Sequence, residues 1–391
     1  MRAFDFYTPT YIHFGENAEL EAGRMVRRFG GSRTLLVSGG QSARRSGLLD
    51  RVSAALEAEG VAWTDFPGAQ PNPLLSHAEA GVRLGLAKQC DFILAVGGGS
   101  AIDTAKAIAH GMAHPDEKLW DVWTGKVSLC KTIPVGVVLT IPAAGSEMSD
   151  SAVLTNQALE TKRGLNTDYH RPVFALMNPA LALDLPWYQK ACGVTDIMMH
   201  TLDRYFNPVW DNELTDAIAV GLLRTVIANG RALKANPENA HAMSEIMWCG
   251  SLSHNNLTGL GGQKDFSTHQ LGHAISAAFD VTHGASLSAV WASWARYVMP
   301  SSESRFASYA RQVWDAQEPD DRRAANLGID ATERFFAELG MPIRLRELEI
   351  PTEEATLSKL ATLCSYDGTR AVGTFRKLNQ EEILEVYRMA R

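Results

Sequence analysis

Residues 91–106 read DFILAVGGGSAIDTAK, and this stretch decides the fold. Its first part, Asp91–Val96, is almost entirely apolar and predicts a buried strand, and Gly97–Gly99 predict a tight turn directly after it. Residues 101–112 then repeat apolar side chains at helical spacing. A strand that passes through a glycine turn into a helix is one unit of a parallel α/β sheet.

The same alternation extends on both sides of this unit. Further apolar strands are predicted at 34–37, 61–63 and 135–140. Helices are predicted at 48–60 and 76–88, the second with Ser76 as its N-cap. Because the strands are nearly continuous apolar runs, we expect a parallel sheet that is covered on both faces.

The pattern changes after Pro186, where β-branched runs almost disappear and helical spacing takes over. We therefore predict two domains, an α/β domain at 1–186 and an all-α domain at 187–391. The helices predicted in the second domain span 190–206, 212–234, 238–256, 267–279, 286–298, 303–315, 320–339, 353–363 and 380–390.

Composition excludes several classes of protein. The 391 residues carry 44 acidic and 37 basic side chains, a net charge of −7, which argues against a nucleic-acid partner. No apolar run is long enough to span a membrane, and the acidic, aromatic N-terminal residues do not have the pattern of a secretion signal. The five cysteines are widely separated and odd in number, which favours a reducing cytoplasm over a disulfide framework.

Two segments could bind a nucleotide. The glycine turn at 97–99 and the helix that follows it could hold a pyrophosphate on backbone N–H groups, although an ordinary βα turn has the same pattern. After the strand at 34–37, the residues SGGQSARR contain two arginines and no acid that could bind a ribose 2′-hydroxyl. This favours NADP(H) over NAD(H), unless Arg44 and Arg45 are simply solvated helix residues.

Histidine and aspartate side chains gather in three short apolar segments between 193 and 284. Asp196 and His200 are four residues apart on a predicted helix, as are His269 and His273, so each pair shares one helix face. His283 follows, and the adjacent Gly284 is expected to form a turn or cap. Buried ionisable groups are costly without a charge partner, and a divalent metal, Fe(II) or Zn(II), suits imidazole and carboxylate ligands.

One alternative at these histidines is a zinc peptidase site. The sequence HQLGH at 269–273 has the spacing of a zinc peptidase, but Gln270 stands where that motif needs a glutamate as general base. His254, farther along the predicted helix 238–256, is expected to be structural.

Taken together, these segments resemble the iron-containing, or group III, alcohol dehydrogenases over essentially the whole chain. The resemblance is closest to the branch of NADPH-dependent aldehyde reductases and butanol dehydrogenases, through SGGQSARRSG (38–47) and DFSTHQLGHAISAAFDVTHG (265–284). The other motifs that carry it are Phe6, Pro9, Thr10, Ile12, Phe14 and Gly15, the GGGSxxDxxK segment 97–106, and Pro142, Ala143, Gly145, Ser146 and Glu147.

The resemblance implies a fold like that of dehydroquinate synthase, with a Rossmann-like α/β domain, an all-helical domain and a metal and nicotinamide that meet between them. It implies that His273 is a proton relay or orienting group rather than a ligand. The implied metal ligands are Asp196, His200, His269 and His283. The implied cofactor contacts are Ser38, Gly39, Gly40, Gly98, Gly99, Ser100, Asp103, Thr140 and Lys162.

Two positions depart from the family pattern. Ala144 stands where many relatives have threonine, and Ser149 stands where the close branch often has asparagine. Family members are usually dimers or larger, so we expect a homo-oligomer, and the aromatic segment 4–14 is a candidate dimer strand.

The expected activity is hydride transfer between NADP(H) and short to medium-chain aldehydes or primary alcohols, assisted by the metal. The alternatives are an NAD-dependent polyol dehydrogenase, a metal lyase of the dehydroquinate synthase type and an inactive binding scaffold. The lyase would need basic residues around a phosphate-bearing substrate, whereas only Lys264 lies close to the histidine segments in sequence.

Overall fold

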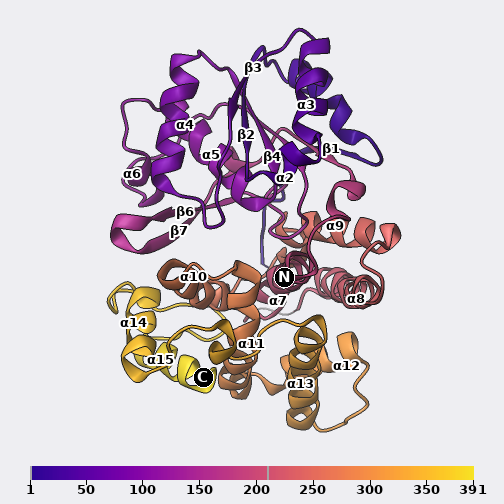
Figure 1. Ribbon diagram of the computed structural model, residues 1–391. Helices are drawn as coiled ribbons and strands as arrows, with labels where there is room; N and C mark the ends of the chain where they lie inside the picture. The colour runs from indigo at the N-terminus through magenta and orange to yellow at the C-terminus, as the bar shows by residue number, and fades with distance from the viewer. Residues whose placement is uncertain (1, 209–210) are drawn as a thin grey trace. The chain divides into compact units, whose positions relative to one another are not determined.

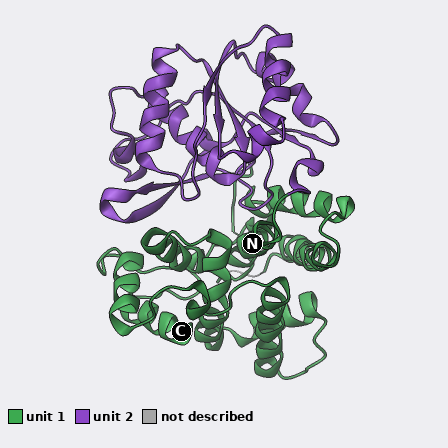
Figure 2. Ribbon diagram, in the orientation of Figure 1, with its two compact units in different colours: residues 1–6, 185–391 green, residues 7–184 purple. Residues whose placement is uncertain are grey.

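The chain is described by a computed structural model, which covers residues 2–208 and 211–391. It divides into two compact units, shown in Figure 2. One is formed by Tyr7–Asp184 and the other by Met1–Phe6 with Leu185–Arg391. Residues 2–6 thus group with the second unit, whereas the sequence pattern placed them in the α/β domain.

A six-stranded, all-parallel sheet forms the centre of the unit 7–184 (Figure 1), as the sequence predicted. Its order is β1-β8-β5-β4-β2-β3, so β1 is an edge strand and the glycine-turn strand β4 is central. The strands are β1 (Tyr11–Phe14), β2 (Arg33–Ser38), β3 (Ala62–Phe66), β4 (Phe92–Gly97), β5 (Val135–Leu139) and β8 (Phe174–Met177).

Six helices accompany this sheet. They are α1 (Ala22–Arg28), α2 (Ser42–Arg45), α3 (Leu48–Ala58), α4 (Leu75–Ala87), α5 (Gly99–Ala113) and α6 (Leu119–Trp123). The prediction of Ser76 as the N-cap of α4 is wrong, because the helix begins one residue earlier and its N-cap, Leu74, makes no side-chain bond. The backbone of this helix is already turning at Leu75, so the serine hydroxyl lies within the first turn.

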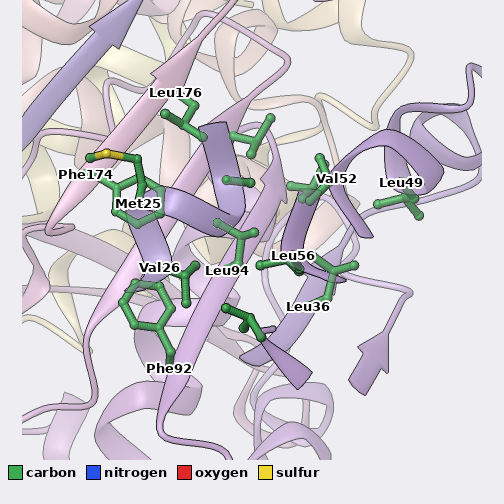
Figure 3. Packing of buried hydrophobic residues seen from close by; sticks show 14 of the residues in the cluster. Met25, Val26, Leu36, Leu49, Val52, Leu56, Phe92, Leu94, Phe174 and Leu176 are labelled. Atoms are coloured by element: carbon green, nitrogen blue, oxygen red, sulfur yellow. The ribbon is translucent and has the colours of Figure 1, made fainter. Parts of the chain in front are cut away.

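The core of this unit follows from the alternation of side chains along its strands. Leu36, Leu94 and Leu176 come from three different strands and pack with Val52 and Leu56 of α3, as Figure 3 shows. All five side chains are at most 1% exposed. Burial of such side chains contributes about 2 kcal/mol each, which fixes the sheet register and therefore the positions of the strand ends.

A short antiparallel hairpin was not predicted from the sequence. It is formed by β6 (Ser151–Asn156) and β7 (Thr161–Asn166). The sequence between these strands, QALE, carries none of the Asn-Gly or Asp-Gly signals of a tight hairpin, and Gly164 weakens the strand pattern of β7. Residues 161–166 are therefore extended because they pair with β6, and not because of their own strand propensity.

The second unit is helical, as predicted. Its helices are α7 (Trp187–Tyr205), α8 (Glu213–Ala235), α9 (Ala240–His254), α10 (Ser267–Phe279), α11 (His283–Val298), α12 (Glu303–Trp314), α13 (Asp321–Leu339), α14 (Glu354–Ser365) and α15 (Gln380–Met389). Short 3₁₀ helices in the chain span Ala18–Glu21, Gln157–Leu159, Asp168–His170, Pro179–Ala182, Leu257–Gly259, Met299–Ser301 and Leu345–Leu348. Within the described ranges, no helix combines the length and apolar character needed to cross a membrane.

Gly284 is not the turn or cap that the sequence suggested. It is the second residue of α11, whose N-cap is Thr282. A Cβ atom at this position would lie 2.4 Å from the carbonyl oxygen of Cys192 in α7. The absence of a side chain therefore allows α7 and α11 to approach closely, and these are the helices that carry Asp196, His200 and His283.

Two buried histidines of the α/β unit make its stability depend on pH. The rings of His110 in α5 and His170 lie 4.7 Å apart, centroid to centroid, and both side chains are at most 1% exposed. Burial, with smaller contributions from His114 and Lys106, lowers the pKa of His110 to about 3. Burial also lowers the pKa of His170 well below its usual value. Both imidazoles are therefore neutral in the folded protein near pH 6.

We predict that acid destabilises this unit through His110. Below pH 6.5 the unfolded chain takes up a proton that the folded chain excludes, so stability falls as the pH drops from about 6.5 to about 3. The loss is about 1.4 kcal/mol per pH unit, or about 2 kcal/mol between pH 6.5 and 5.0. Urea unfolding at these two pH values should show that His110→Leu loses less stability than the wild-type protein by this amount. Equal losses in both proteins would contradict the prediction.

Candidate metal centre and cofactor segments

Asp196 and His200 form the first half of a cluster on α7. Their spacing of four residues places them on one face of the helix, as the sequence predicted. The Nδ1 atom of His200 lies 3.3 Å from Oδ1 of Asp196, and both side chains are buried. The helix therefore presents a carboxylate and an imidazole side by side inside the helical unit.

Two other helices bring the remaining candidates to the same carboxylate. His269 of α10 places Nε2 3.7 Å from Oδ1 of Asp196. His283, the first residue of α11, places Nε2 3.8 Å from the same oxygen. All four residues predicted as ligands are thus brought together from three helices, although they span 88 positions of sequence.

The donor atoms fit a divalent metal ion. Those of Asp196, His200 and His269 all lie within 4.8 Å of one another. Four ligand atoms about 2.1 Å from one tetrahedral ion are about 3.4 Å apart, close to the separations measured here. Asp196 Oδ1, His200 Nδ1 and His269 Nε2 are also buried and have no hydrogen-bond partner among the described residues. Imidazole and carboxylate donors suit Fe(II) or Zn(II).

The electrostatic surroundings of two cluster histidines differ. For His269, burial opposes the charged form, but the nearby carboxylates of Asp196 and Asp203 outweigh this effect and raise the pKa. For His200, burial lowers the pKa well below its usual value, and the neighbouring His254 and His269 add to the effect. The cluster therefore attracts positive charge at the two aspartates while keeping the lone pairs of His200 available.

Asp203 is a member of this site that the sequence analysis missed. Its Oδ2 lies 2.6 Å from Nδ1 of His269, and its side chain is fully buried. The sequence does carry a signal for Asp203, because it follows Asp196 by seven residues, which is two turns of α7 and the same helix face.

His254, expected to be structural, has its ring centroid 3.9 Å from that of His200.

His273 lies beside the cluster rather than within it. Its ring centroid is 5.1 Å from that of His283 and 6.3 Å from that of His269. It is half-buried and is not one of the three residues whose donor atoms converge. The role of His273 as a proton relay or orienting group stays a prediction.

Gln270, which replaces the general base of a peptidase motif, is held by another partner. Nη2 of Arg370 donates to Oε1 of Gln270 at 2.7 Å, and the guanidinium also stacks on the ring of Tyr366. A carboxamide is too weak a base to accept a proton from water, which leaves the peptidase alternative without its base.

The predicted cofactor segments meet at the carboxyl-terminal ends of three neighbouring strands of the parallel sheet. Ser38 is the last residue of β2, Gly98 is the N-cap of α5 after β4, and Thr140 directly follows β5. These three strands are adjacent in the sheet, and their carboxyl ends therefore form one edge. In open α/β sheets this edge is where ligands bind.

The glycines of this segment are required by close packing. A Cβ atom at Gly98 would lie 2.8 Å from Cβ of Ile141, and one at Gly99 would lie 3.0 Å from Cβ of Ala144.

Gly39 and Gly40 lie in the loop after β2, where Gly39 O accepts a hydrogen bond from Gly68 N. Ser100 is the second residue of α5, where its backbone N–H points out of the helix N-terminus.

Asp103 and Lys162 have internal partners. Asp103 accepts from Ser146 Oγ at 2.5 Å and from Val153 N at 2.9 Å, which ties α5 to β6 and the loop before it. Lys106 donates to the same Ser146 hydroxyl at 2.8 Å. Lys162 of β7 donates to Oδ1 of Asn72 at 3.0 Å. The cofactor contacts assigned to Asp103 and Lys162 stay predictions.

The structure also brings an acid to the end of β2. Asp65 of β3 pairs in register with Leu36 of β2, and its carboxylate forms an ion pair with Arg44. Both side chains are partly exposed. The sequence analysis found no acid here because Asp65 comes from the neighbouring strand rather than from the loop after β2.

Both units of the chain match models of one known protein family. Residues 9–179 match the family described as iron-containing alcohol dehydrogenase, and residues 190–391 match the C-terminal part of the same family. The chain belongs to the iron-containing alcohol dehydrogenase family, as the resemblance in its sequence indicated.

Individual relatives carry different cofactor names. The chain is 34% identical to NADH-dependent butanol dehydrogenase A of Clostridium acetobutylicum, over 99% of each chain. It is 31% identical to the NADPH-dependent aldehyde reductase YqhD of Escherichia coli, over the full length of both. Among solved structures, a butanol dehydrogenase from Thermotoga maritima matches with a TM-score of 0.96 at 28% identity, covering 100% of this chain and 99% of that one.

Proposed function

We propose that this protein is a metal-dependent alcohol dehydrogenase and aldehyde reductase that acts on short to medium-chain aldehydes and primary alcohols. The observation that carries the proposal is the convergence of buried donor atoms from Asp196, His200 and His269. Membership of the iron-containing alcohol dehydrogenase family supports it, as do relatives named for butanol and aldehydes.

In the proposed site Asp196, His200, His269 and His283 would hold one divalent ion, either Fe(II) or Zn(II). When bound, this ion supplies a Lewis acid that polarises a carbonyl group and stabilises the alkoxide. Three of these side chains, those of Asp196, His200 and His269, are each less than 5% exposed, so water has little access to them. His273, half-buried beside His283, is the group proposed to pass a proton to the carbonyl oxygen.

In the proposed reaction, a bound nicotinamide cofactor would supply the hydride for the carbonyl carbon, a proton would go to the oxygen, and the products would be an alcohol and the oxidised cofactor. The chain itself would hold the cofactor in the position that the reaction needs. The turn at Gly98–Ser100 and the N-terminus of α5 would hold the pyrophosphate, and Ser38, Gly39 and Gly40 would border the adenosine end.

For the cofactor itself we propose NADP(H), on the basis of Arg44 and Arg45, the last two residues of the short helix α2 after β2. NAD(H) is the second candidate, because Asp65 is paired with Arg44 and could accept a ribose hydroxyl instead. Relatives named for either cofactor are known.

A cytoplasmic location stays a prediction and rests on the five free cysteines.

We predict that the protein, reconstituted with Fe(II) or Zn(II), oxidises NADPH in the presence of butanal. Loss of nicotinamide absorbance should be faster with NADPH than with NADH at equal concentration. Arg44→Ala should raise KM for NADPH with little change for NADH, because it removes charge that would face a 2′-phosphate. No oxidation of either cofactor across a panel of aldehydes would disprove the proposed function. A preference for NADH would favour the second candidate.

The two histidines of α10 should separate metal binding from catalysis. His269→Ala removes a proposed ligand, so the purified protein should contain little metal and have little activity. His273→Ala should keep its metal and lose turnover, because only the proton relay is removed. Metal content by mass spectrometry and initial rates measure both effects. If His273→Ala also emptied the site, the assignment of ligands would be wrong.

We also propose a homodimer, formed through the edge strand β1. Within residues 2–208 and 211–391, β8 is the one strand that pairs with β1, and Tyr11 and Phe14 are more than one-third exposed. Tyr11 N donates to Val173 O and Gly15 N donates to Met177 O of β8, so by alternation the N–H group of Ile12 points away from β8. An open edge with aromatic side chains is suited to pairing with a second chain.

Light scattering should therefore give about twice the chain mass of 42.7 kDa. Ile12→Pro should shift the protein toward the monomer, because it removes an outward N–H without disturbing the bonds to β8. Leu159→Glu, which changes an exposed apolar side chain in the β6–β7 connection, serves as the control and should leave the mass unchanged. A wild-type monomer would rule out the proposal.

A further inference from the structure

A carboxylate that is not one of the proposed ligands contacts one of the ligand histidines. Oδ2 of Asp203 lies 2.6 Å from Nδ1 of His269. The two residues are on different helices, α7 and α10, and 66 positions apart in sequence. Both side chains are at least 95% buried, so water does not compete for this bond.

This contact decides which nitrogen of His269 carries the hydrogen. A carboxylate oxygen can only accept a hydrogen bond, so Nδ1 of His269 must be the donor. In the neutral ring the lone pair is then on Nε2. Nε2 is the atom that faces Oδ1 of Asp196 at 3.7 Å and lies within the group of converging donors.

The energetic cost of burying the Asp203 carboxylate also favours a cation bound to His269. Its side chain is 0% exposed, and its other oxygen, Oδ1, has no hydrogen-bond partner among the described residues. Asp265, a second acid, is nearby, and burial followed by repulsion from Asp203 raises its pKa to about 6. A buried carboxylate beside another acid is unfavourable unless positive charge is close. A cation held by His269 supplies that charge through the imidazole.

The position of Asp203 is also fixed by the backbone. The N–H of Asp265 donates to the carbonyl oxygen of Asp203 at 2.8 Å. The side chain of Asp265 in turn accepts from the N–H of Ser267, in the first turn of α10. The end of α7 and the start of α10 are thus joined at the point where Asp203 meets His269, which limits the movement of the ring.

We propose that Asp203 is a positioning residue for the metal centre, which holds His269 with Nε2 presented to the ion and increases the basicity of that nitrogen. This inference rests on the proposed metal site. Carboxylates that orient ligand histidines in this way typically change metal affinity by 10- to 100-fold when they are replaced.

The test compares metal affinity in full-length variants. Asp203→Asn keeps the size of the side chain but removes its charge, so we expect the Kd for Zn²⁺, measured by competition with a chelator, to rise about 10- to 100-fold. The visible absorption of the Co²⁺-loaded protein should change as well, because it reports the ligand field. Asp203→Glu keeps the carboxylate and should lie closer to the wild type in both measurements.

A matched control is Asp216→Asn, which makes the same change of carboxylate to amide in the same unit. Asp216 of α8 pairs with the buried Arg305, so this variant should lose stability but keep its Zn²⁺ affinity. Circular dichroism of the metal-free proteins gives the stability of each variant. If Asp203→Asn does not fold, Asp203→Glu and Asp203→Ser are compared instead.

Two results would count against the inference in distinguishable ways. If the wild-type protein binds Zn²⁺ and Asp203→Asn binds it equally well, with an unchanged Co²⁺ spectrum, Asp203 is only structural. If the wild-type protein binds neither ion, the proposed metal site itself fails. A loss of affinity in Asp203→Asn that Asp216→Asn does not share supports the positioning role.

Discussion

The helical unit is organised around a single carboxylate oxygen, Oδ1 of Asp196. Imidazole nitrogens from α7, α10 and α11 lie 3.3 to 3.8 Å from it. Bringing such groups together inside an apolar unit is costly, because each of them gives up contact with water. The three helices must therefore be held by contacts around the cluster. The bond between Asp203 and His269 and the close approach at Gly284 are two of these contacts.

The α/β unit depends on a different constraint, the register of its parallel strands. Buried side chains fix that register, so the carboxyl ends of β2, β4 and β5 are aligned, and the loops that follow them lie at one edge. The glycines at 98 and 99 then allow α5 to begin close to the segment that follows β5. In this unit the backbone forms most of the candidate binding surface, whereas in the helical unit side chains form it.

Much of this could be predicted from the sequence, because periodicity and helix spacing are local. The range 267–279 for α10 and the pairing of Asp196 with His200 needed only the spacing of residues. What failed depends on tertiary contacts. Asp65 reaches the end of β2 from another strand, and the β6–β7 hairpin forms without a turn signal. Asp203 was visible on the face of α7, but its partner was not.

The close approach at Gly284 also divides the helical glycines of this chain into two kinds. Gly221, in the middle of α8, has no atom within 4 Å of the place where a Cβ would be, so it only costs helix stability, about 1 kcal/mol relative to alanine. Gly284 has the same cost but faces the backbone of α7. A programme that makes the enzyme more heat-resistant by replacing helical glycines with alanine thus has room at 221 and none at 284. The difference lies in the neighbouring helix and cannot be read from either glycine's own surroundings in sequence.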